Sequence, residues 1–337
     1  MRIVNSKLQI NKIIKKKVQH NFVNKYNFLS NKLNINTLIK RSGVNIIMPF
    51  YHTVSNKHLP HIKHLYSYRN TTEFENELEF YLKHFTPISL SDLINRNYKK
   101  DKNYFFLSLD DGLSEVYNII APILLKKGIP ATFFVNTSFI DNKILFNRFK
   151  ASLIFDAYLN KNKIKDNTVN NLDILNNKYT NTELDNLAEM FNVNFSNFLQ
   201  KQKPYLTSEQ INILIKQGFD IGSHSVNHIE YSNLNIEKQN IETIESVKFL
   251  KQNFNIKNTS FSFPFTDYGI DLKFFKQIKN SVDITFGTAG IKLDNAPHNY
   301  QRIPIEEFNI NAEKIVKAEY LYFILSKFVG KHRINRK

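Results

Sequence analysis

The stretch from Phe105 to Gly112 constrains the fold of this 337-residue chain more than any other. Its first five residues read Phe-Phe-Leu-Ser-Leu, and two carboxylates, Asp110 and Asp111, follow them directly. A run that is apolar on both faces is typical of a buried strand in a parallel sheet. Burying two neighbouring carboxylates is costly unless a cation or hydrogen-bond donors compensate them. The pair is therefore either the cap of a turn, for which Asp-Gly is an ordinary signal, or part of a site at a strand end.

Short apolar runs alternate with amphipathic stretches along most of the chain. This alternation predicts an α/β fold, a parallel sheet with helical crossovers, and roughly seven such units favour a barrel over an open sheet. Strands are predicted over 44–52, 88–90, 105–109, 131–136, 220–223, 260–265, 284–288 and 301–305, and helices over 72–84, 113–127, 146–159, 181–200, 207–216, 236–254, 271–279 and 311–328.

Composition shifts along the chain indicate three parts. Residues 1–41, rich in Lys and Asn, are expected to form a basic helical extension outside the core. Residues 42–310 are expected to form the barrel, and residues 311–337 a final helix with a basic tail. The polar, Asn-rich segment 137–206 is interpreted as an insertion over the face of the barrel that carries the site, rather than as a separate domain.

The net charge of +16 is concentrated at the two ends of the chain. Residues 1–72 carry 13 Lys/Arg and no Asp/Glu, and five more Lys/Arg follow Glu319 without an acid. Basic ends are suited to peripheral contact with an anionic membrane or a glycan phosphate, and a solubilising surface is the alternative. No nucleic-acid-binding motif is present. With neither a signal peptide nor a membrane span visible, we expect a cytoplasmic protein, with the inner membrane face as the surface it would contact.

Two histidines follow another predicted strand. His224 and His228 are four residues apart, and on a helical turn this spacing points both imidazoles the same way, which suits one metal ion. The alternative is a pair of unrelated surface histidines. Because the carboxyl ends of parallel strands gather on one face of a barrel, these histidines are expected to meet Asp110 and Asp111 there. The chain has no cysteine, so His and carboxylate must hold any metal, and we expect a divalent ion, Zn²⁺ in the first place.

Three segments together resemble a known family. Residues 108–112 (Ser-Leu-Asp-Asp-Gly), 224–228 (His-Ser-Val-Asn-His) and 263–265 (Phe-Pro-Phe) resemble motifs one to three of the polysaccharide deacetylases, the NodB-homology domains of carbohydrate esterase family 4. The likeness spans about residues 44–306, with the insertion less typical. The resemblance implies a distorted (β/α)7–8 barrel that removes N-acetyl groups from amino sugars.

The resemblance also implies roles for individual residues. Asp111, His224 and His228 would hold the metal, and Asp110 would be the general base that takes a proton from the attacking water. Stabilisation of the oxyanion, or contact with the substrate, is expected from Phe265, Pro264 and Tyr51.

Some features of the family are missing from this sequence. The usual acid, a histidine in a late Leu-x-His motif, has no copy here, but Phe50-Tyr51-His52 resembles the permuted branch that acts on poly-N-acetylglucosamine-like exopolysaccharides. We therefore predict His52 as the general acid. The arginine of motif three is also absent, and Arg302 is predicted to supply the positive partner of the base.

The fourth motif is incomplete as well, because the chain has no tryptophan. Asp267 and Asp283 are both candidates for the acid of that motif, and their spacing does not choose between them. The sequence thus predicts a divalent-metal-dependent deacetylase acting on an N-acetylated glycan or a lipid-linked glycan precursor. Two alternatives remain, a metal-dependent amidase on a non-sugar C–N bond and a catalytically degenerate glycan-binding protein.

Overall fold

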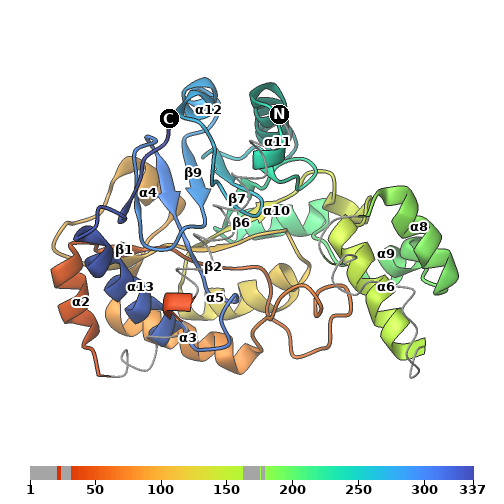
Figure 1. The fold of residues 1–337 in the computed structure, drawn as a ribbon, viewed down its shortest axis with the longest axis horizontal. Helices are drawn as coiled ribbons and strands as arrows, with labels where there is room; N and C mark the ends of the chain where they lie inside the picture. Colours follow the sequence, from red (N-terminus) through yellow and green to blue (C-terminus); the bar gives the residue numbers. More distant parts are fainter. Residues whose placement is uncertain (1–20, 24–31, 162–174, 176–178) are drawn as a thin grey trace.

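The computed structural model describes residues 21–23, 32–161, 175 and 179–337 of the chain (Figure 1). Its centre is a sheet of eight short strands in which every pairing is parallel. In spatial order the strands are β11 (Asn299–Gln301), β9 (Ile284–Gly287), β8 (Ser260–Ser262), β7 (Asp220–Ser223), β6 (Ala131–Val135), β5 (Leu107–Leu109), β2 (Pro49–Tyr51) and β12 (Ile303–Pro304).

The two edges of this sheet belong to one stretch of chain. β11 and β12 flank the single residue Arg302, and β11 pairs with β9 while β12 pairs with β2. The backbone N–H of Arg302 donates to Gly287 O at 3.1 Å, and the next N–H, of Ile303, donates to Met48 O at 2.8 Å on the other side. This stretch therefore closes the sheet, and the predicted distorted (β/α)7–8 barrel is confirmed.

Helices surround the barrel strands. The largest apolar cluster lies between the outer faces of the strands and helices α2, α3, α5, α10 and α13. The helices are α2 (Ile35–Ser42), α3 (Thr71–His84), α4 (Leu90–Asn95), α5 (Ala121–Lys127), α6 (Asn147–Lys161), α8 (Asn181–Met190), α9 (Phe195–Gln202), α10 (Ser208–Lys216), α11 (Ile236–Phe254), α12 (Leu272–Ile278) and α13 (Ala312–Lys327), with single turns η1 (Val116–Ile120), η2 (Ile140–Asn142) and η3 (Tyr231–Asn233).

Two small sheets complete the part of the fold that the structure describes. β1 (Ile46–Ile47), β4 (Tyr104–Phe105) and β3 (Thr86–Pro87) form one, and β10 (Leu293–Asp294) pairs with β13 (Arg333–Ile334) in the other. Among the described helices, none is both long enough and apolar enough to cross a membrane.

Several helix starts differ from the sequence-based prediction. Helix α3 begins at Thr71, one residue before its predicted start, and Asn70 caps it: the Asn70 side chain accepts from Glu73 N, and the Glu73 carboxylate accepts from Asn70 N. The predicted strand at 88–90 is wrong, since Ser89 caps α4 there. By contrast, helix α10 lies within its predicted range of 207–216, and Thr207 and Gln210 form a capping box at its start.

The predicted N-terminal extension was placed outside the core, and most of it, residues 1–20 and 24–31, lies outside the described residues. Its last part forms α2, which packs against α13 and buries Ile35, Leu38 and Ile39 in the main core. These residues are part of the packed fold because the periodic apolar face of α2 needs a partner.

Candidate active site

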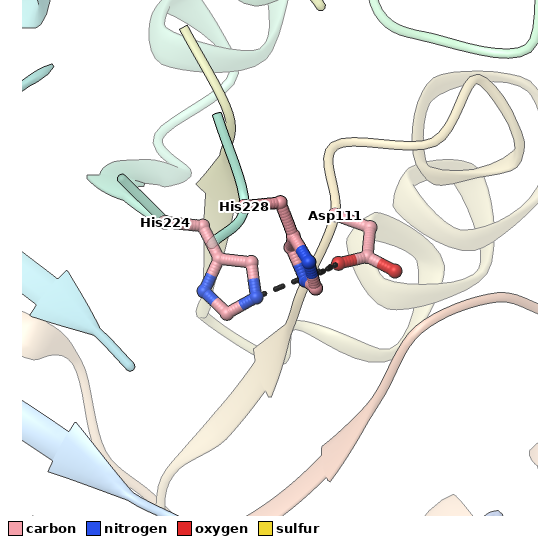
Figure 2. Close-up of side chains that lie close together, drawn as sticks. All are labelled: Asp111, His224 and His228. Atoms are coloured by element: carbon pink, nitrogen blue, oxygen red, sulfur yellow. Dashed lines mark ion pairs between the residues drawn. The ribbon is translucent and has the colours of Figure 1, made fainter. Parts of the chain in front are cut away.

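Three side chains from two loops converge at the carboxyl end of the barrel (Figure 2). Asp111 follows β5, and His224 and His228 follow β7; one ligand atom from each lies within 4.8 Å of the others. Asp111 Oδ1 is 3.5 Å from His224 Nε2 and 3.1 Å from His228 Nε2. All three residues are buried.

The two histidines do not lie on a helical turn, so that part of the prediction is wrong. The chain after β7 is irregular, and Ser225 and His228 have φ of 72° and 55°, in the left-handed region. Asp111 (φ 72°) and Phe265 (φ 59°) share this conformation. Such backbone costs about 1–3 kcal/mol per non-glycine residue and gathers at functional sites.

The donor set of this cluster fits a divalent cation. His224 Nδ1 donates to Ser262 O at 2.8 Å, which leaves an unprotonated Nε2 facing Asp111 when the ring is neutral. Burial lowers the pKa of His228, so this imidazole is neutral at neutral pH and able to bind a cation. Asp111 Oδ1 is buried and has no hydrogen-bond partner among the described residues. A buried carboxylate oxygen between two imidazole nitrogens, with no donor of its own, is suited to a cation.

The second carboxylate is held apart from this cluster by Arg302. The guanidinium binds both oxygens of Asp110, with Nη1–Oδ1 at 2.8 Å and Nη2–Oδ2 at 2.7 Å. Arg302 is fully buried and also lies over the ring of Phe50, 4.2 Å from its centroid. Burial alone would raise the pKa of Asp110, but the charge and hydrogen bonds of Arg302, together with the charges of His224 and His52, outweigh it and the pKa lies below its ordinary value. Asp110 is therefore an ionised, oriented base candidate.

His52 is paired with a carboxylate that the sequence analysis missed. Its Nδ1 lies 2.7 Å from Glu306 Oε2, and the backbone N–H groups of His52 and Thr53 also donate to Glu306. Burial would lower the pKa of His52, but the hydrogen bond to Glu306 and the nearby aspartates raise it to about 9. The imidazole is therefore protonated at neutral pH, which suits a general acid.

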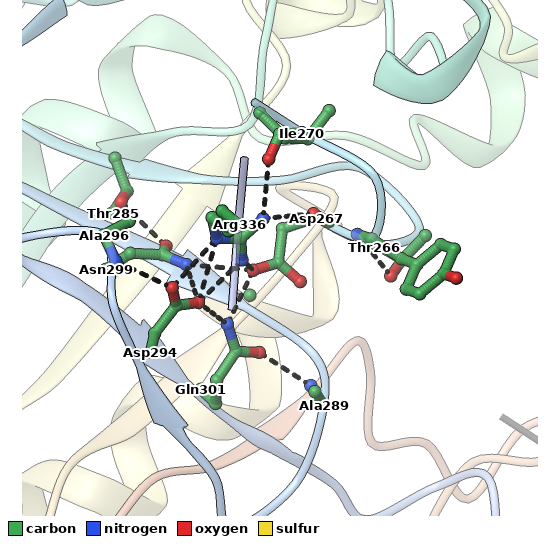
Figure 3. Close-up of polar contacts among 12 residues, drawn as sticks. Thr266, Asp267, Ile270, Thr285, Ala289, Asp294, Ala296, Asn299, Gln301 and Arg336 are labelled. Carbon is green, nitrogen blue, oxygen red and sulfur yellow. Dashed lines mark hydrogen bonds and ion pairs between the residues drawn. The ribbon is translucent and has the colours of Figure 1, made fainter. Parts of the chain in front are cut away.

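Neither acid considered for the fourth motif is the carboxylate that pairs with His52. Asp283 accepts from the N–H and hydroxyl of Thr259, at 2.8 and 2.7 Å. Asp267 is paired with Arg336 (Figure 3). The sequence signal for Glu306 is its position just beyond the strand that closes the barrel, beside β2, which leads into His52.

Tyr51 was predicted to contact the substrate, and the structure contradicts this. Its side chain is fully buried, and its hydroxyl lies 2.8 Å from Glu77 Oε2 and 2.9 Å from Tyr81 Oη, both on α3. Successive residues of a strand point to opposite faces, so Tyr51 faces the helices while Phe50 and His52 face the site.

The loop after β8 lies over the cluster and is anchored on its far side. The ring of Phe265 is 4.7 Å from that of His228, and the buried Pro264 precedes it. Arg336 Nη1 donates to the carbonyls of Asp267 at 2.7 Å and Ile270 at 3.2 Å (Figure 3). The guanidinium also pairs with the carboxylates of Asp267 and Asp294, so the C-terminal segment fixes the loop that carries Phe265.

The segment 137–206 adjoins the site. The ring of Phe146, just before α6, is 4.6 Å from that of His228. The N–H of Leu206 donates to Gly112 O at 2.9 Å, which ties the end of the segment to the Asp110–Gly112 turn.

Comparison with known proteins shows the class to which this fold and site belong. Residues 97–286, more than half of the chain, match the polysaccharide deacetylase family, and the chain belongs to it. It is therefore a hydrolase acting on non-peptide carbon–nitrogen bonds. No curated protein matches the chain.

Solved structures share the fold at low sequence identity. Deacetylase PplD of Streptococcus pyogenes, solved with acetate, has a TM-score of 0.54 and 17% identity over 82% of this chain and 98% of its own. IcaB of Ammonifex degensii has a TM-score of 0.53 and 13% identity, over 82% and 97%. The de-N-acetylase of Aggregatibacter actinomycetemcomitans has a TM-score of 0.50 and 15% identity, over 81% and 99%.

Proposed function

We propose that the chain is a divalent-metal-dependent deacetylase that hydrolyses the N-acetyl group of an amino sugar in a glycan or a lipid-linked glycan precursor. The observation that carries the proposal is the buried cluster of Asp111, His224 and His228 beside an aspartate held by Arg302. A family that acts on carbon–nitrogen bonds and a donor set suited to Zn²⁺ support it.

Each residue has a defined task in this reaction. An ion bound by Asp111, His224 and His228 would polarise the acetamide carbonyl and lower the pKa of water beside it. Asp110, kept ionised by Arg302, takes a proton from the attacking water.

The remaining tasks concern the oxyanion and the leaving group. The backbone N–H of Phe265 is the proposed donor to the developing oxyanion. His52, whose charge is supported by Glu306, gives a proton to the departing amine. The first-strand position of this acid supports the permuted exopolysaccharide branch of the family.

Acetate release from N-acetylglucosamine oligomers, with and without chelator, tests the proposal. We expect release that chelation abolishes and Zn²⁺ restores. Asp110→Asn should lose turnover but keep bound metal, whereas Asp111→Asn should lose both. Asp185→Asn, at an exposed ion pair with Lys150 on helices α8 and α6, is the matched control and should behave as wild type.

Two outcomes would favour the alternative functions. Hydrolysis of small linear or cyclic amides without hydrolysis of glycans would point to an amidase. Oligomer binding without turnover by wild-type protein would point to a glycan-binding protein.

A cytoplasmic location with peripheral contact at the inner membrane face also remains a proposal. It is supported by the 13 basic residues within residues 1–72. The C-terminal basic tail contributes less than its sequence indicates, because Arg336 is buried in ion pairs. Replacing the Lys and Arg residues before position 33 with Gln should weaken sedimentation with vesicles containing phosphatidylserine, and equal sedimentation would contradict the idea.

A further inference from the structure

Arg148, in the first turn of α6, is a cation beside the candidate active site that has no role in the proposed deacetylation. Its Cζ lies 5.6 Å from the centroid of the Phe265 ring, and its charge interacts with Asp111 and Tyr66. Within the part of the chain that the structure describes, Arg148 forms no hydrogen bond or ion pair. It is half-buried, so its charge is only partly screened by solvent.

The position of Arg148 is not explained by the stability of its helix. A cation in the first turn interacts unfavourably with the positive end of the helix dipole, and the first turn of α6 contains no acidic residue to compensate. Lys150, two residues later, shows the ordinary arrangement: its Nζ is 3.0 Å from Asp185 Oδ1 and 5.0 Å from the centroid of the Phe195 ring. A residue that breaks a local rule without a structural gain points to a functional role.

Tyr66 supplies a second donor in the same place. Its ring is 4.7 Å from that of His52, and its hydroxyl is near enough to Asp111, Glu306 and Arg148 for their charges to shift its pKa. The hydroxyl is buried and has no hydrogen-bond partner among the described residues. Burial and the surrounding carboxylates raise the pKa of Tyr66, so the hydroxyl keeps its proton and is available as a donor.

A guanidinium and a phenol hydroxyl that both lack acceptors among the residues described are complementary to an anion. The planar fork of Arg matches carboxylate and phosphate oxygens, and such charge-assisted bonds are stronger than neutral ones. We propose that Arg148 and Tyr66 form an anion-recognising subsite beside the catalytic cluster, so that the preferred substrate carries a carboxylate or phosphate close to the sugar that is deacetylated. This inference rests on the proposed deacetylase function and narrows its substrate class.

Steady-state kinetics on three matched oligosaccharides test the subsite. These are neutral N-acetylglucosamine oligomers, the same oligomers bearing phosphate, and oligomers in which N-acetylglucosamine alternates with a uronic acid. Wild type should prefer one of the two acidic oligomers. The identity of the preferred oligomer shows whether the subsite recognises a phosphate or a carboxylate. Arg148→Gln should reduce this preference in kcat/KM about 10- to 100-fold, mainly through KM. Tyr66→Phe should reduce it less, and Lys150→Gln should leave it unchanged.

Two kinetic results would overturn the inference. One is an unchanged preference in Arg148→Gln. The other is an equal fall in kcat on neutral and acidic oligomers, which would indicate that Arg148 stabilises the oxyanion instead of reading the substrate.

A binding measurement separates failure of the subsite from failure of the deacetylase. Calorimetric titration of Asp110→Asn, with Arg148 intact or changed to Gln, needs no turnover. Tighter binding of an acidic oligomer that depends on Arg148 supports the subsite even if no acetate is released from any substrate. Equal affinity for neutral and acidic oligomers refutes the subsite even if deacetylation is observed.

Discussion

Replacing Arg302 with methionine should destabilise the protein strongly, and by an amount that depends on pH. The side chain is fully buried and binds both oxygens of Asp110, which is itself only 2% exposed. Methionine fills a similar space but leaves the carboxylate without a cation. Breaking a buried ion pair in this way costs about 3–5 kcal/mol, because the remaining charge is neither hydrated nor paired.

The pH dependence follows from the direction of the Asp110 pKa. In wild type this pKa lies below the ordinary value of 3.8, so the pair contributes stability above that value and loses it as pH falls through the folded-state pKa. In Arg302→Met the two contributions of Arg302 are lost, and burial, the largest single cause, raises the folded-state pKa against the smaller effects of His224 and His52. The variant therefore loses stability as pH rises above 3.8, by up to about 1.4 kcal/mol per pH unit until the raised pKa is reached.

Urea unfolding of metal-free protein at about pH 4.5 and pH 8 measures this pH-dependent loss of stability. The two pH values lie about one and four units above the ordinary carboxyl pKa. The cost of Arg302→Met should be smaller at the lower pH and reach about 3–5 kcal/mol at the higher. The double variant Asp110→Asn/Arg302→Met should recover much of the loss. Lys127→Met, at a pair with the exposed Glu79, should cost at most about 1 kcal/mol. A cost that is equal at both pH values, or below that of the Lys127 control, would refute the reasoning.

Two further predictions concern the turn and the acid. Gly112→Ala should lower the free energy of urea unfolding by about 1–3 kcal/mol and weaken zinc binding, because φ is +63° and the new Cβ would lie 2.9 Å from Val135 Cγ1. The control Gly128→Ala, with φ of +65° and open space around the new Cβ, should cost less stability. Equal costs for the two variants would exclude the clash with Val135 as the cause. Glu306→Gln should move the alkaline limb of the kcat/KM profile to lower pH, since the His52 pKa of about 9 depends first on Glu306 among the groups that raise it, and an unmoved limb would exclude His52 as the acid.

The predictable parts of the site are those whose residues lie close together in short sequence motifs. Asp110 and Asp111 end a buried strand, and the barrel brings strand ends together, so their meeting with His224 and His228 followed from sequence pattern and topology. The partner of His52 was harder to predict, because Glu306 lies 254 residues away and its only sequence signal is its position just beyond a predicted strand, without a motif.

Two errors of the sequence analysis have different physical causes. The strand periodicity of two already places Tyr51 on the face opposite His52, so its burial against α3 could have been foreseen. The loop between His224 and His228 could not, because the left-handed backbone of Ser225 and His228 is held by the surrounding fold and not by their own preference.

The position of Arg302 between the two edges of the sheet makes activity depend on closure of the barrel. Its contacts with Asp110 join positions 192 residues apart, so the base is paired and oriented only when the 299–304 stretch has docked between β9 and β2. Transient local unfolding of this stretch would abolish catalytic activity while the rest of the chain stayed folded. Hydrogen exchange of the Ile303 amide should therefore track loss of turnover in mild denaturant, ahead of the global transition.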